Sequence, residues 1–342
     1  MKRRITLQDI ALDLNLTPAT VSRALNNHPE ISDKTKRMVE ETASRLDYNR
    51  NKIASSLRSG KTHVIGVLIP TAEPAFFGSV IHGITNMANH NGYDVIIYQS
   101  NESYDYEVKG IKAFISARVD GILASISKDT IDCSHFLRAK RNGIPVVLFD
   151  RVNNDLDIPS VTVDDYQGGF LATEHLIRQG YKRIAHVSGP QHIKAFYDRL
   201  KGYRGALQAN GVAYDPSLVF AGDICIEAGK RAVESFVSLP NPPDAIFAVE
   251  DFAALGVIKK LKELEVKMPE EIGVFGFCND LFSEHITPGL STIDQQTVLM
   301  GQEAFKMMLN MIDTNDLKYQ PTNVILNPVP VIRESSLRSR KA

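Results

Sequence analysis

The sequence TLQDIALDLNLTPATVSRALN (residues 6–26) contains two short helical patterns separated by a tight turn. Thr6 can cap the first helix, and an acid three residues later completes a capping box. Asn15 tolerates the left-handed conformation that such a turn often requires. Thr17 is a favourable N-cap, and Pro18 suits the first position of the second helix. This stretch therefore predicts two helices joined by a tight turn.

A third helix is predicted directly after this stretch. Ser32 can cap it, and Val39, Ala43 and Leu46 recur at helical spacing and form its inward face. Two short helices joined by a tight turn and braced by a third form a helix-turn-helix unit, which typically binds DNA. A generic three-helix domain without a DNA ligand is the alternative.

The charge distribution favours the DNA-binding interpretation. Residues 1–62 contain 12 Lys and Arg against 7 Asp and Glu, whereas residues 63–342 contain 27 against 33. A basic head on an acidic body indicates that the head alone meets a polyanion. The alternative is a chance distribution of surface charge.

Composition and cysteine usage exclude several classes of protein. The chain has 342 residues, of which 43% are hydrophobic and 23% charged, as in ordinary globular domains. The longest apolar runs are too short to span a bilayer, and no apolar segment follows the basic N-terminus, so we predict a cytoplasmic protein without membrane association. The cysteines Cys133, Cys225 and Cys278 lie far apart, which argues against a disulfide framework and a zinc site.

From about Lys61 onward, short β-rich runs alternate with amphipathic helical patterns. This alternation predicts an α/β body with parallel sheets and right-handed crossovers. The predicted strands are Val64–Ile69, Asp94–Tyr98, Gly121–Ile126, Val146–Phe149, Arg183–Ser188, Ala245–Val249 and Ile272–Phe277.

The body contains an internal repeat. The segments GITNMANHNG (residues 83–92) and GYRGALQANG (residues 202–211) share a first Gly, a central Ala and a terminal Asn-Gly at matching spacing. Each follows a predicted strand and a loop. We therefore expect two similar doubly wound α/β subdomains side by side, with a ligand cleft between the loops at their strand ends.

Motifs of catalysis and cofactor binding are missing from the sequence. There is no G-x-G-x-x-G after the first predicted strand, no phosphate-binding G-x-x-x-x-G-K-[ST], no H-E-x-x-H, no G-x-S-x-G and no Cys/His cluster. We therefore predict no cofactor, no metal and no enzymatic activity. The alternative is a cytoplasmic small-molecule-binding or enzymatic α/β protein with an accessory helical head.

Motifs along nearly the whole chain resemble the lactose-repressor (LacI/GalR) family of bacterial transcription regulators. They include residues 6–26, NKIASSLRSGKTHVIGVLIP, PVVLFDR, VTVDDYQGG, EHLIRQGYKRIAHVSGP, DRLKGYRGAL and GVFGFCND followed by PGLSTIDQQ. The resemblance implies a body like that of periplasmic sugar-binding proteins. It also implies a homodimer, with a tetramer possible, whose two heads bind a pseudo-palindromic double-stranded operator under control of a small-molecule effector.

The resemblance also implies a division of the chain into domains. Residues 1–48 would form the helix-turn-helix DNA-binding domain, and residues 49–61 a hinge helix or linker. Residues 62–342 would bind the effector and dimerise. Within them we expect an N-subdomain of about residues 62–163 and 293–322, and a C-subdomain of about residues 164–292 and 323–342.

In the family, the second head helix enters the major groove of DNA. Pro18 and Ala19 can make only apolar contacts there, and Arg23 is the best candidate for a bidentate contact to guanine. Phosphate contact or solvated charge is the alternative for Arg23. The remaining candidates are expected to contact phosphates; they are Thr17, Thr20, Ser22 and Asn26.

The family's hinge helices bind the minor groove, and Asn51 to Arg58 is predicted to be such a helix of about two turns. Leu57 matches the leucine that wedges between central base pairs, and Ala54 matches the small residue beside it. Asn51 is the remaining DNA-binding candidate of this segment. In the alternative reading, Leu57 only packs the linker against the body.

The family's effector lies in the cleft of the body. Phe76 and Phe77 match aromatic positions at its border, Asp150 a cleft-facing acid, and Arg199 an arginine that grips an effector oxygen. Cys278 stands where the family commonly has an Asp that binds sugar hydroxyls. Further candidates at strand ends are Ser127, Glu250 and Asp251.

These cleft residues have structural alternatives: helix anchoring for the two phenylalanines and salt bridging for Arg199. The loss of the usual Asp at position 278 indicates an effector less like a plain hexose. A sugar, a sugar acid, a phosphorylated sugar and another small metabolite all remain open, as does the choice between inducer and corepressor.

Overall fold

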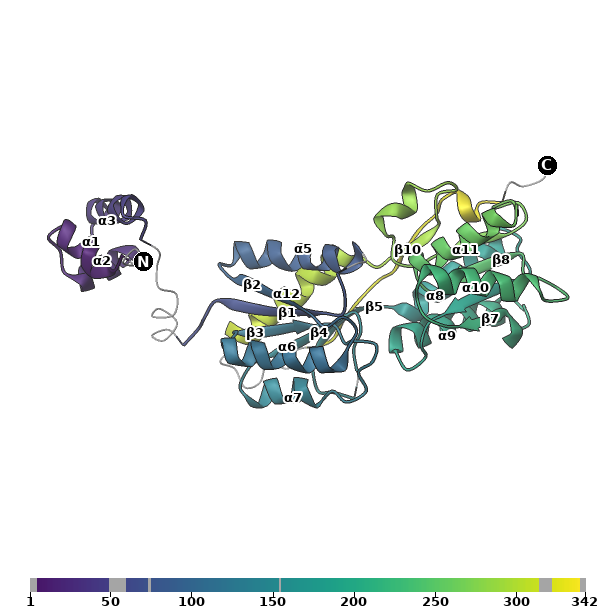
Figure 1. The fold of residues 1–342 in the computed structure, drawn as a ribbon, viewed down its shortest axis with the longest axis horizontal. Coiled ribbons are helices and arrows are strands. Elements are labelled where there is room, and N and C mark those ends of the chain that lie inside the picture. Colours follow the sequence, from purple (N-terminus) through teal and green to yellow (C-terminus); the bar gives the residue numbers. More distant parts are fainter. Residues whose placement is uncertain (1–4, 49–59, 73–74, 154, 314–321, 339–342) are drawn as a thin grey trace. The chain divides into compact units, whose positions relative to one another are not determined.

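The computed structural model describes residues 5–48, 60–72, 75–153, 155–313 and 322–338 (Figure 1). The chain divides into two compact units, the head of residues 1–62 and the body of residues 63–342. Each unit has its own hydrophobic core.

Within residues 5–48, the head consists of α1 (Leu7–Asp13), α2 (Pro18–Leu25) and α3 (Asp33–Arg45). The predicted caps are confirmed. The Thr6 N–H donates to Asp9 Oδ2 at 2.8 Å, and Thr17 Oγ1 accepts the N–H of Thr20 at 3.1 Å. Asn15 has a φ of 54° between the first two helices, as the tight turn requires. The helices enclose a small core of Ile10, Ala11, Val21, Ala24, Val39 and Ala43.

The first lobe of the body is built on a parallel sheet with strand order β11-β5-β4-β3-β1-β2. Its strands are β1 (Val64–Ile69), β2 (Asp94–Gln99), β3 (Gly121–Ala124), β4 (Val146–Phe149), β5 (Ser160–Val163) and β11 (Val324–Leu326). Its helices are α5 (Ala75–His90), α6 (Tyr104–Ala117), α7 (Ser134–Arg141) and α12 (Thr297–Asp313).

The central strands β1, β3 and β4 are buried on both faces, so they are apolar throughout rather than alternating, whereas the edge strand β2 is mostly exposed. Val67 packs with α5 and α12 on one face, whereas the next residue, Leu68, packs with α6 and α7 on the other (Figure 1). This explains why runs such as VIGVLI predicted the strands correctly.

The second lobe contains a parallel sheet with strand order β7-β6-β8-β9. Its strands are β6 (Ile184–Ser188), β7 (Val219–Ala221), β8 (Ala245–Ala248) and β9 (Gly273–Phe275). Its helices are α8 (Asp165–Arg178), α9 (Lys194–Ala209), α10 (Ile226–Val237) and α11 (Asp251–Glu263). Short 3-10 helices cover Pro216–Leu218, Leu281–Glu284 and Glu334–Ser336. An antiparallel pair, β10 (Thr292–Asp294) with β12 (Val329–Val331), lies where the chain passes between the lobes.

All the strands predicted from the sequence are present, with some ends shortened by one to two residues and one extended by one. The sequence patterns did not predict β5, β7, β10, β11 and β12, which have three or four residues each and show no clear periodicity. One subdomain assignment was wrong. Residues 324–326 were assigned to the second lobe, but β11 pairs with β5 in the first sheet, with Val324 opposite Val161.

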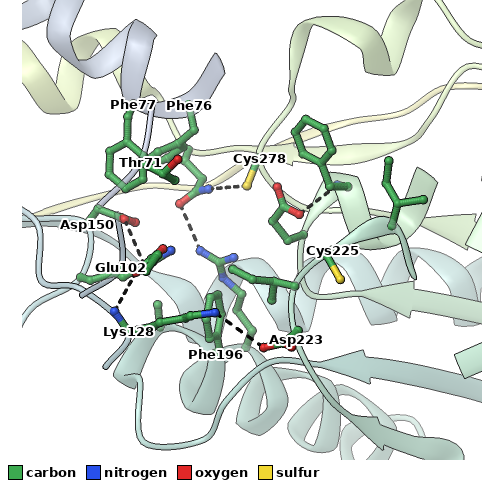
Figure 2. Close-up of a pocket in the computed structure, with 18 of the residues that line it drawn as sticks. Thr71, Phe76, Phe77, Glu102, Lys128, Asp150, Phe196, Asp223, Cys225 and Cys278 are labelled. Atoms are coloured by element: carbon green, nitrogen blue, oxygen red, sulfur yellow. Dashed lines mark hydrogen bonds and ion pairs between the residues drawn. The ribbon is translucent and has the colours of Figure 1, made fainter. Parts of the chain in front are cut away.

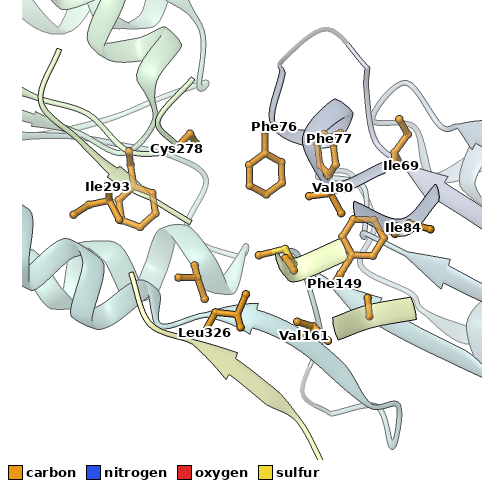
Figure 3. Close-up of a cluster of buried hydrophobic side chains, with 14 of the residues drawn as sticks. Ile69, Phe76, Phe77, Val80, Ile84, Phe149, Val161, Cys278, Ile293 and Leu326 are labelled. Carbon is orange, nitrogen blue, oxygen red and sulfur yellow. The ribbon is translucent and has the colours of Figure 1, made fainter. Parts of the chain in front are cut away.

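One large hydrophobic cluster connects the two lobes (Figure 3). It includes Phe76, Phe77 and Phe149 from the first lobe, and Ile293 and Cys278 from the other side. The two lobes therefore share one continuous hydrophobic cluster. Some side chains of this cluster also line the cleft described below.

Three helix pairs of the body are packed through reciprocal glycines. At each of these glycines an added Cβ would lie 2.0–2.3 Å from a backbone carbonyl oxygen of the facing helix. The pairs are Gly83 and Gly301 of α5 and α12, Gly169 and Gly202 of α8 and α9, and Gly229 and Gly256 of α10 and α11. These are also the helix pairs with the most extensive contact in the described chain. Glycine at these positions lets the helix backbones touch.

The internal repeat in the sequence now has a physical explanation. Its two copies lie in α5 of the first lobe and α9 of the second. Each begins at a packing glycine, Gly83 or Gly202, and ends at a glycine with positive φ, 72° at Gly92 and 68° at Gly211. The two copies therefore resemble each other for two reasons: the first glycine allows close helix packing, and the last glycine adopts the left-handed conformation of the turn.

Replacing Gly202 with alanine should lower the free energy of unfolding by about 1–3 kcal/mol, because its Cβ would lie 2.1 Å from the Tyr166 carbonyl oxygen. Gly78→Ala is the matched control, since a Cβ at this exposed position of α5 meets nothing within 4 Å. The control should raise helix stability by up to about 1 kcal/mol. Urea denaturation followed by circular dichroism measures both, and equal stabilities of the two variants would contradict the packing argument.

Candidate functional site

The first candidate site is one face of α2 in the head. Val21 and Ala24 are buried against α1 and α3, which turns the opposite side of the helix toward solvent. The predicted DNA-contacting residues lie on the solvent side: Thr17, Pro18, Ala19, Arg23 and Asn26 are exposed, and Thr20 and Ser22 are half-buried.

Arg23 has only a weak protein partner. Its guanidinium lies 3.5 Å from the Glu30 carboxylate, and the two side chains are 58% and 70% exposed. An ion pair this open contributes at most about 1 kcal/mol and is screened by salt. Arg23 can therefore exchange Glu30 for another partner at low cost.

Two other candidates on this face already form hydrogen bonds to the backbone of α2. Thr17 Oγ1 caps the N-terminus, and Asn26 Nδ2 donates to the carbonyl oxygen of Ser22 at 2.7 Å. The remaining DNA-binding candidates, Asn51, Ala54 and Leu57, lie outside the described residues.

The second candidate site is a cleft of about 1090 Å³ in the body, lined by both lobes (Figure 2). Thr71, Phe76, Phe77, Glu102, Lys128, Asp150 and Arg151 line it from the first lobe. Phe196, Arg199, Asp223, Ile224, Cys225, Glu250, Phe252 and Cys278 line it from the second lobe, and Gln295 from the segment after β10. These residues cluster after strand ends, where open α/β sheets place ligand sites.

Arg199 is the most heavily bonded side chain of the cleft and is only 2% exposed. Its Nε donates to Asp165 Oδ1 at 2.8 Å, its Nη1 to the carbonyl of Val249 at 2.8 Å, and its Nη2 to Gln295 Oε1 at 3.1 Å. The guanidinium also lies 3.6 Å from the centre of the Phe277 ring. Burial is the largest single effect and lowers the pKa of Arg199, but Asp165, Cys278 and Asp150 together raise this pKa above its ordinary value. The predicted salt-bridge alternative is therefore present, on a residue that also lines the cleft.

A second arginine pair was not predicted from the sequence. Arg151 Nη1 lies 2.8 and 2.9 Å from the two carboxylate oxygens of Glu102, and Glu102 Oε2 also accepts the N–H of Lys128 at 2.8 Å. The Arg151 guanidinium lies about equally far from the rings of Phe77 and Phe196, at 6.0 and 5.9 Å. Arg151 directly follows the predicted Asp150, so its position at a strand end was the signal that could have revealed it.

Two carboxyl groups of the cleft have raised pKa values. Burial raises the pKa of Asp150, against the opposing effects of Arg151 and Arg199, and Ser125 Oγ donates to Asp150 Oδ2 at 3.4 Å. Burial, followed by the nearby acid Asp251, raises the pKa of Glu250 to about 8. Glu250 Oε2 accepts the N–H of Phe252 at 2.9 Å and so caps α11.

Cys278 lies on the same wall. Burial first, and the Glu250 carboxyl second, raise the pKa of its thiol well above the usual value. Gln295 Nε2 lies 3.0 Å from Cys278 Sγ. The thiol therefore stays protonated at neutral pH and presents a weakly polar surface to the cleft.

The structure does not support two of the predicted effector-binding residues. Ser127 and Asp251 are buried but do not line the cleft. The Ser127 N–H donates to Glu107 at 2.7 Å, and its hydroxyl lies 2.5 Å from that of Ser100.

Asp251 is fully buried. It accepts hydrogen bonds from the hydroxyls of Thr292 and Ser283 and from the N–H of Asp280, at 2.7–2.8 Å. Its oxygens point to these neighbours, so it ties α11 to the strand and loop beside it rather than facing a ligand.

Polar contacts bridge the cleft between the lobes. Lys128 Nζ lies 3.8 Å from Asp223 Oδ1, and His192 Nε2 donates to the carbonyl of Lys128 at 2.7 Å. Because Lys128 belongs to the first lobe and its partners to the second, these contacts must change when the angle between the lobes changes.

The described part of the chain contains neither a metal-binding cluster nor a membrane-spanning helix. In these residues, no group of three or more His, Cys, Asp or Glu side chains is arranged to hold a metal ion. No helix in the same residues combines the length and apolar character that crossing a bilayer requires.

Family comparisons agree with this architecture. The family described as "Periplasmic binding proteins and sugar binding domain of LacI family" matches residues 62–334, and "Bacterial regulatory proteins, lacI family" matches residues 6–51. The HTH-type transcriptional repressor CytR of Escherichia coli (strain K12) is 32% identical over 307 residues, which cover 90% of this chain and 89% of that protein. Catabolite control protein A of Priestia megaterium is 32% identical over 309 residues, covering 89% and 91%.

Solved structures share the fold. The transcriptional regulator CelR in complex with cellobiose superposes with a TM-score of 0.74 at 26% identity, covering 97% of this chain and 100% of that one. A lac repressor dimer bound to operator and the anti-inducer ONPF has a TM-score of 0.86 at 23% identity, covering 98% and 100%. The chain thus belongs to the LacI family of bacterial regulatory proteins, and it is a DNA-binding transcriptional repressor with an effector-binding body, not an enzyme.

Proposed function

We propose that this protein is a cytoplasmic homodimer that represses carbohydrate-utilisation genes and responds to a small molecule bound in its cleft. The observation that carries the proposal is the cleft itself, which is lined by charged and aromatic side chains of both lobes. A ligand that touches both lobes can stabilise one angle between them. The similar regulator CelR, solved with cellobiose, supports a carbohydrate-like ligand, and the operator-bound lac repressor dimer supports the assembly. A tetramer stays a further prediction.

We propose that the exposed face of α2 enters the major groove of a pseudo-palindromic operator. Arg23 would donate to a guanine, and Pro18 and Ala19 would make apolar contact with a thymine methyl. The phosphate contacts would come from Thr17, Thr20, Ser22 and Asn26. In the linker, Leu57 would wedge between base pairs of the minor groove, with Asn51 and Ala54 beside it.

In the cleft, we propose that the effector contacts Phe76, Phe77, Asp150, Arg199, Glu250 and Cys278. Binding would favour one angle between the lobes and with it one set of contacts around Lys128. A ligand that moves the population decisively must prefer one state by several kcal/mol. Coupling to the operator would follow from the altered separation of the two linkers in the dimer.

Replacing Arg23 with alanine should weaken operator binding by about 5- to 150-fold, which corresponds to the roughly 1–3 kcal/mol of a bidentate contact to guanine. The measurement is a gel-shift titration at fixed salt, with an operator selected from genomic fragments and a scrambled DNA for comparison. Arg45→Ala is the control of equal charge, because Arg45 on α3 pairs with Asp13 of α1. Equal losses for the two variants, or a loss of the same size on scrambled DNA, would assign Arg23 to phosphates.

Glu250→Gln should stabilise the body increasingly as pH rises from 5 to about 8. The folded protein retains the Glu250 proton up to a pKa of about 8, whereas the unfolded chain loses it near the ordinary value of 4.5, so wild-type stability falls across this window. At pH 8 the variant should exceed the wild type by at least about 1.4 kcal/mol, the equivalent of one pKa unit. Thermal or urea unfolding at several pH values tests this. Glu227→Gln, at an exposed position of the same cleft, should show no such trend.

A further inference from the structure

The two buried arginines of the cleft are already neutralised by the protein. Arg199 pairs with Asp165 at 2.8 Å, and Arg151 pairs with both oxygens of Glu102. Each arginine is less than one-tenth exposed. An anionic ligand would have to compete with these internal carboxylates in a poorly solvated site, where like charges repel strongly.

Two further acids remain after this pairing. Asp150 and Glu250 also line the cleft, and among the described residues no lysine or arginine forms an ion pair with either at less than 4.0 Å. The nearest is Arg151, whose Nε lies 4.0 Å from Asp150 while its Nη1 is engaged by Glu102. Lys128 is paired with Asp223 across the cleft. Lys259, Asp129 and Glu227 line the cleft too, but they are exposed, so water screens them. The buried part of the cleft therefore carries an excess of acid.

The excess is greatest around Glu250. The acids Asp251 and Asp280 are its electrostatic neighbours, and the third group beside it is the Cys278 thiol. None of these is a cation, and Arg199, which lowers the pKa of the Cys278 thiol, is hydrogen-bonded to the Asp165 carboxylate. In the free protein the Glu250 carboxyl keeps its proton up to a pKa of about 8. A ligand with a positive charge would favour the ionised form of this carboxyl, whereas a neutral hydroxyl or an anion would not.

We propose that the effector is a polyhydroxylated molecule that carries a protonated amino group, with this group bound beside Glu250 and its hydroxyls toward Asp150. The inference rests on the proposed effector site and narrows it. It excludes the sugar acids and phosphorylated sugars that the sequence left open, because each would bring a negative charge to this cluster of acids. The rings of Phe76, Phe77 and Phe196 supply apolar surface for the carbon skeleton.

The test is calorimetric titration of the purified full-length protein with matched ligands. Each set contains a sugar, its amino sugar, its N-acetylated amino sugar, its uronic acid and its 6-phosphate, in the gluco, galacto and manno series. In at least one series, the amino sugar should bind at least tenfold more tightly than the parent and the N-acetyl compound, and the acid and phosphate should show no binding. Glu250→Gln should remove the tenfold preference. Glu263→Gln, at an exposed position of α11 outside the cleft lining, should keep it.

The inference is overturned if an acid or phosphate binds as tightly as the amino sugar, if the amino sugar and its parent bind equally, or if no amino sugar binds in any series. Gel shifts with the same preparation separate this failure from failure of the wider proposal. If a neutral or acidic sugar changes operator binding, only the proposal of an amino-group ligand is contradicted. Operator binding that responds to no small molecule, in a protein whose cleft binds none, would sink the effector site itself.

Discussion

The buried guanidinium of Arg199 is the constraint on which the body depends. A charge this deep is stable only when it is paired with an opposite charge and its nitrogens are hydrogen-bonded. Asp165 at the start of α8, the Val249 carbonyl after β8 and Gln295 in the segment after β10 supply the acceptors. The same side chain thus ties the first helix of the second lobe, a strand end and an interlobe connection to one point at the bottom of the cleft. Its role in holding the protein together limits what it can offer to a ligand.

Reciprocal glycines give the lobes the stiffness that a clamp requires. At the α5–α12, α8–α9 and α10–α11 interfaces, backbone meets backbone, so few side-chain rearrangements can absorb a strain. In the proposed mechanism, movement between the lobes would fall on the connections around β10 and β12 and on polar contacts such as Lys128 with Asp223 and His192. The proposed ligand would then act on the angle between the lobes rather than on the packing within each lobe.

The charged side chains of the cleft that are not paired within the protein determine which kind of ligand the cleft favours. Each arginine of the cleft has a carboxylate at 2.8 Å, whereas Asp150 has only Arg151 at 4.0 Å, and Glu250 has no basic partner within the described residues. Burial raises the pKa of both of these acids, so each is held at a cost in free energy unless a ligand compensates for it. Such unfavourable groups on a cavity wall are typical of binding sites rather than of structural cores.

The sequence alone determined the head, the alternation of strands and helices, the internal repeat and the family, because these depend on local caps, periodicity and motifs. Thr6, Thr17 and Ser32 cap helices through neighbours three residues away, and Gly92 and Gly211 turn the chain through their own φ angles. Pairings between distant residues are not encoded in any local pattern. Only the tertiary structure showed that β11 returns to the first sheet, that Ser127 and Asp251 turn away from the cleft, and that Arg151 is held by Glu102, 49 residues earlier. These long-range pairings decide which charged side chains of the cleft stay unpaired and can contact a ligand. A carboxylate meets its basic partner only when the fold brings the two together.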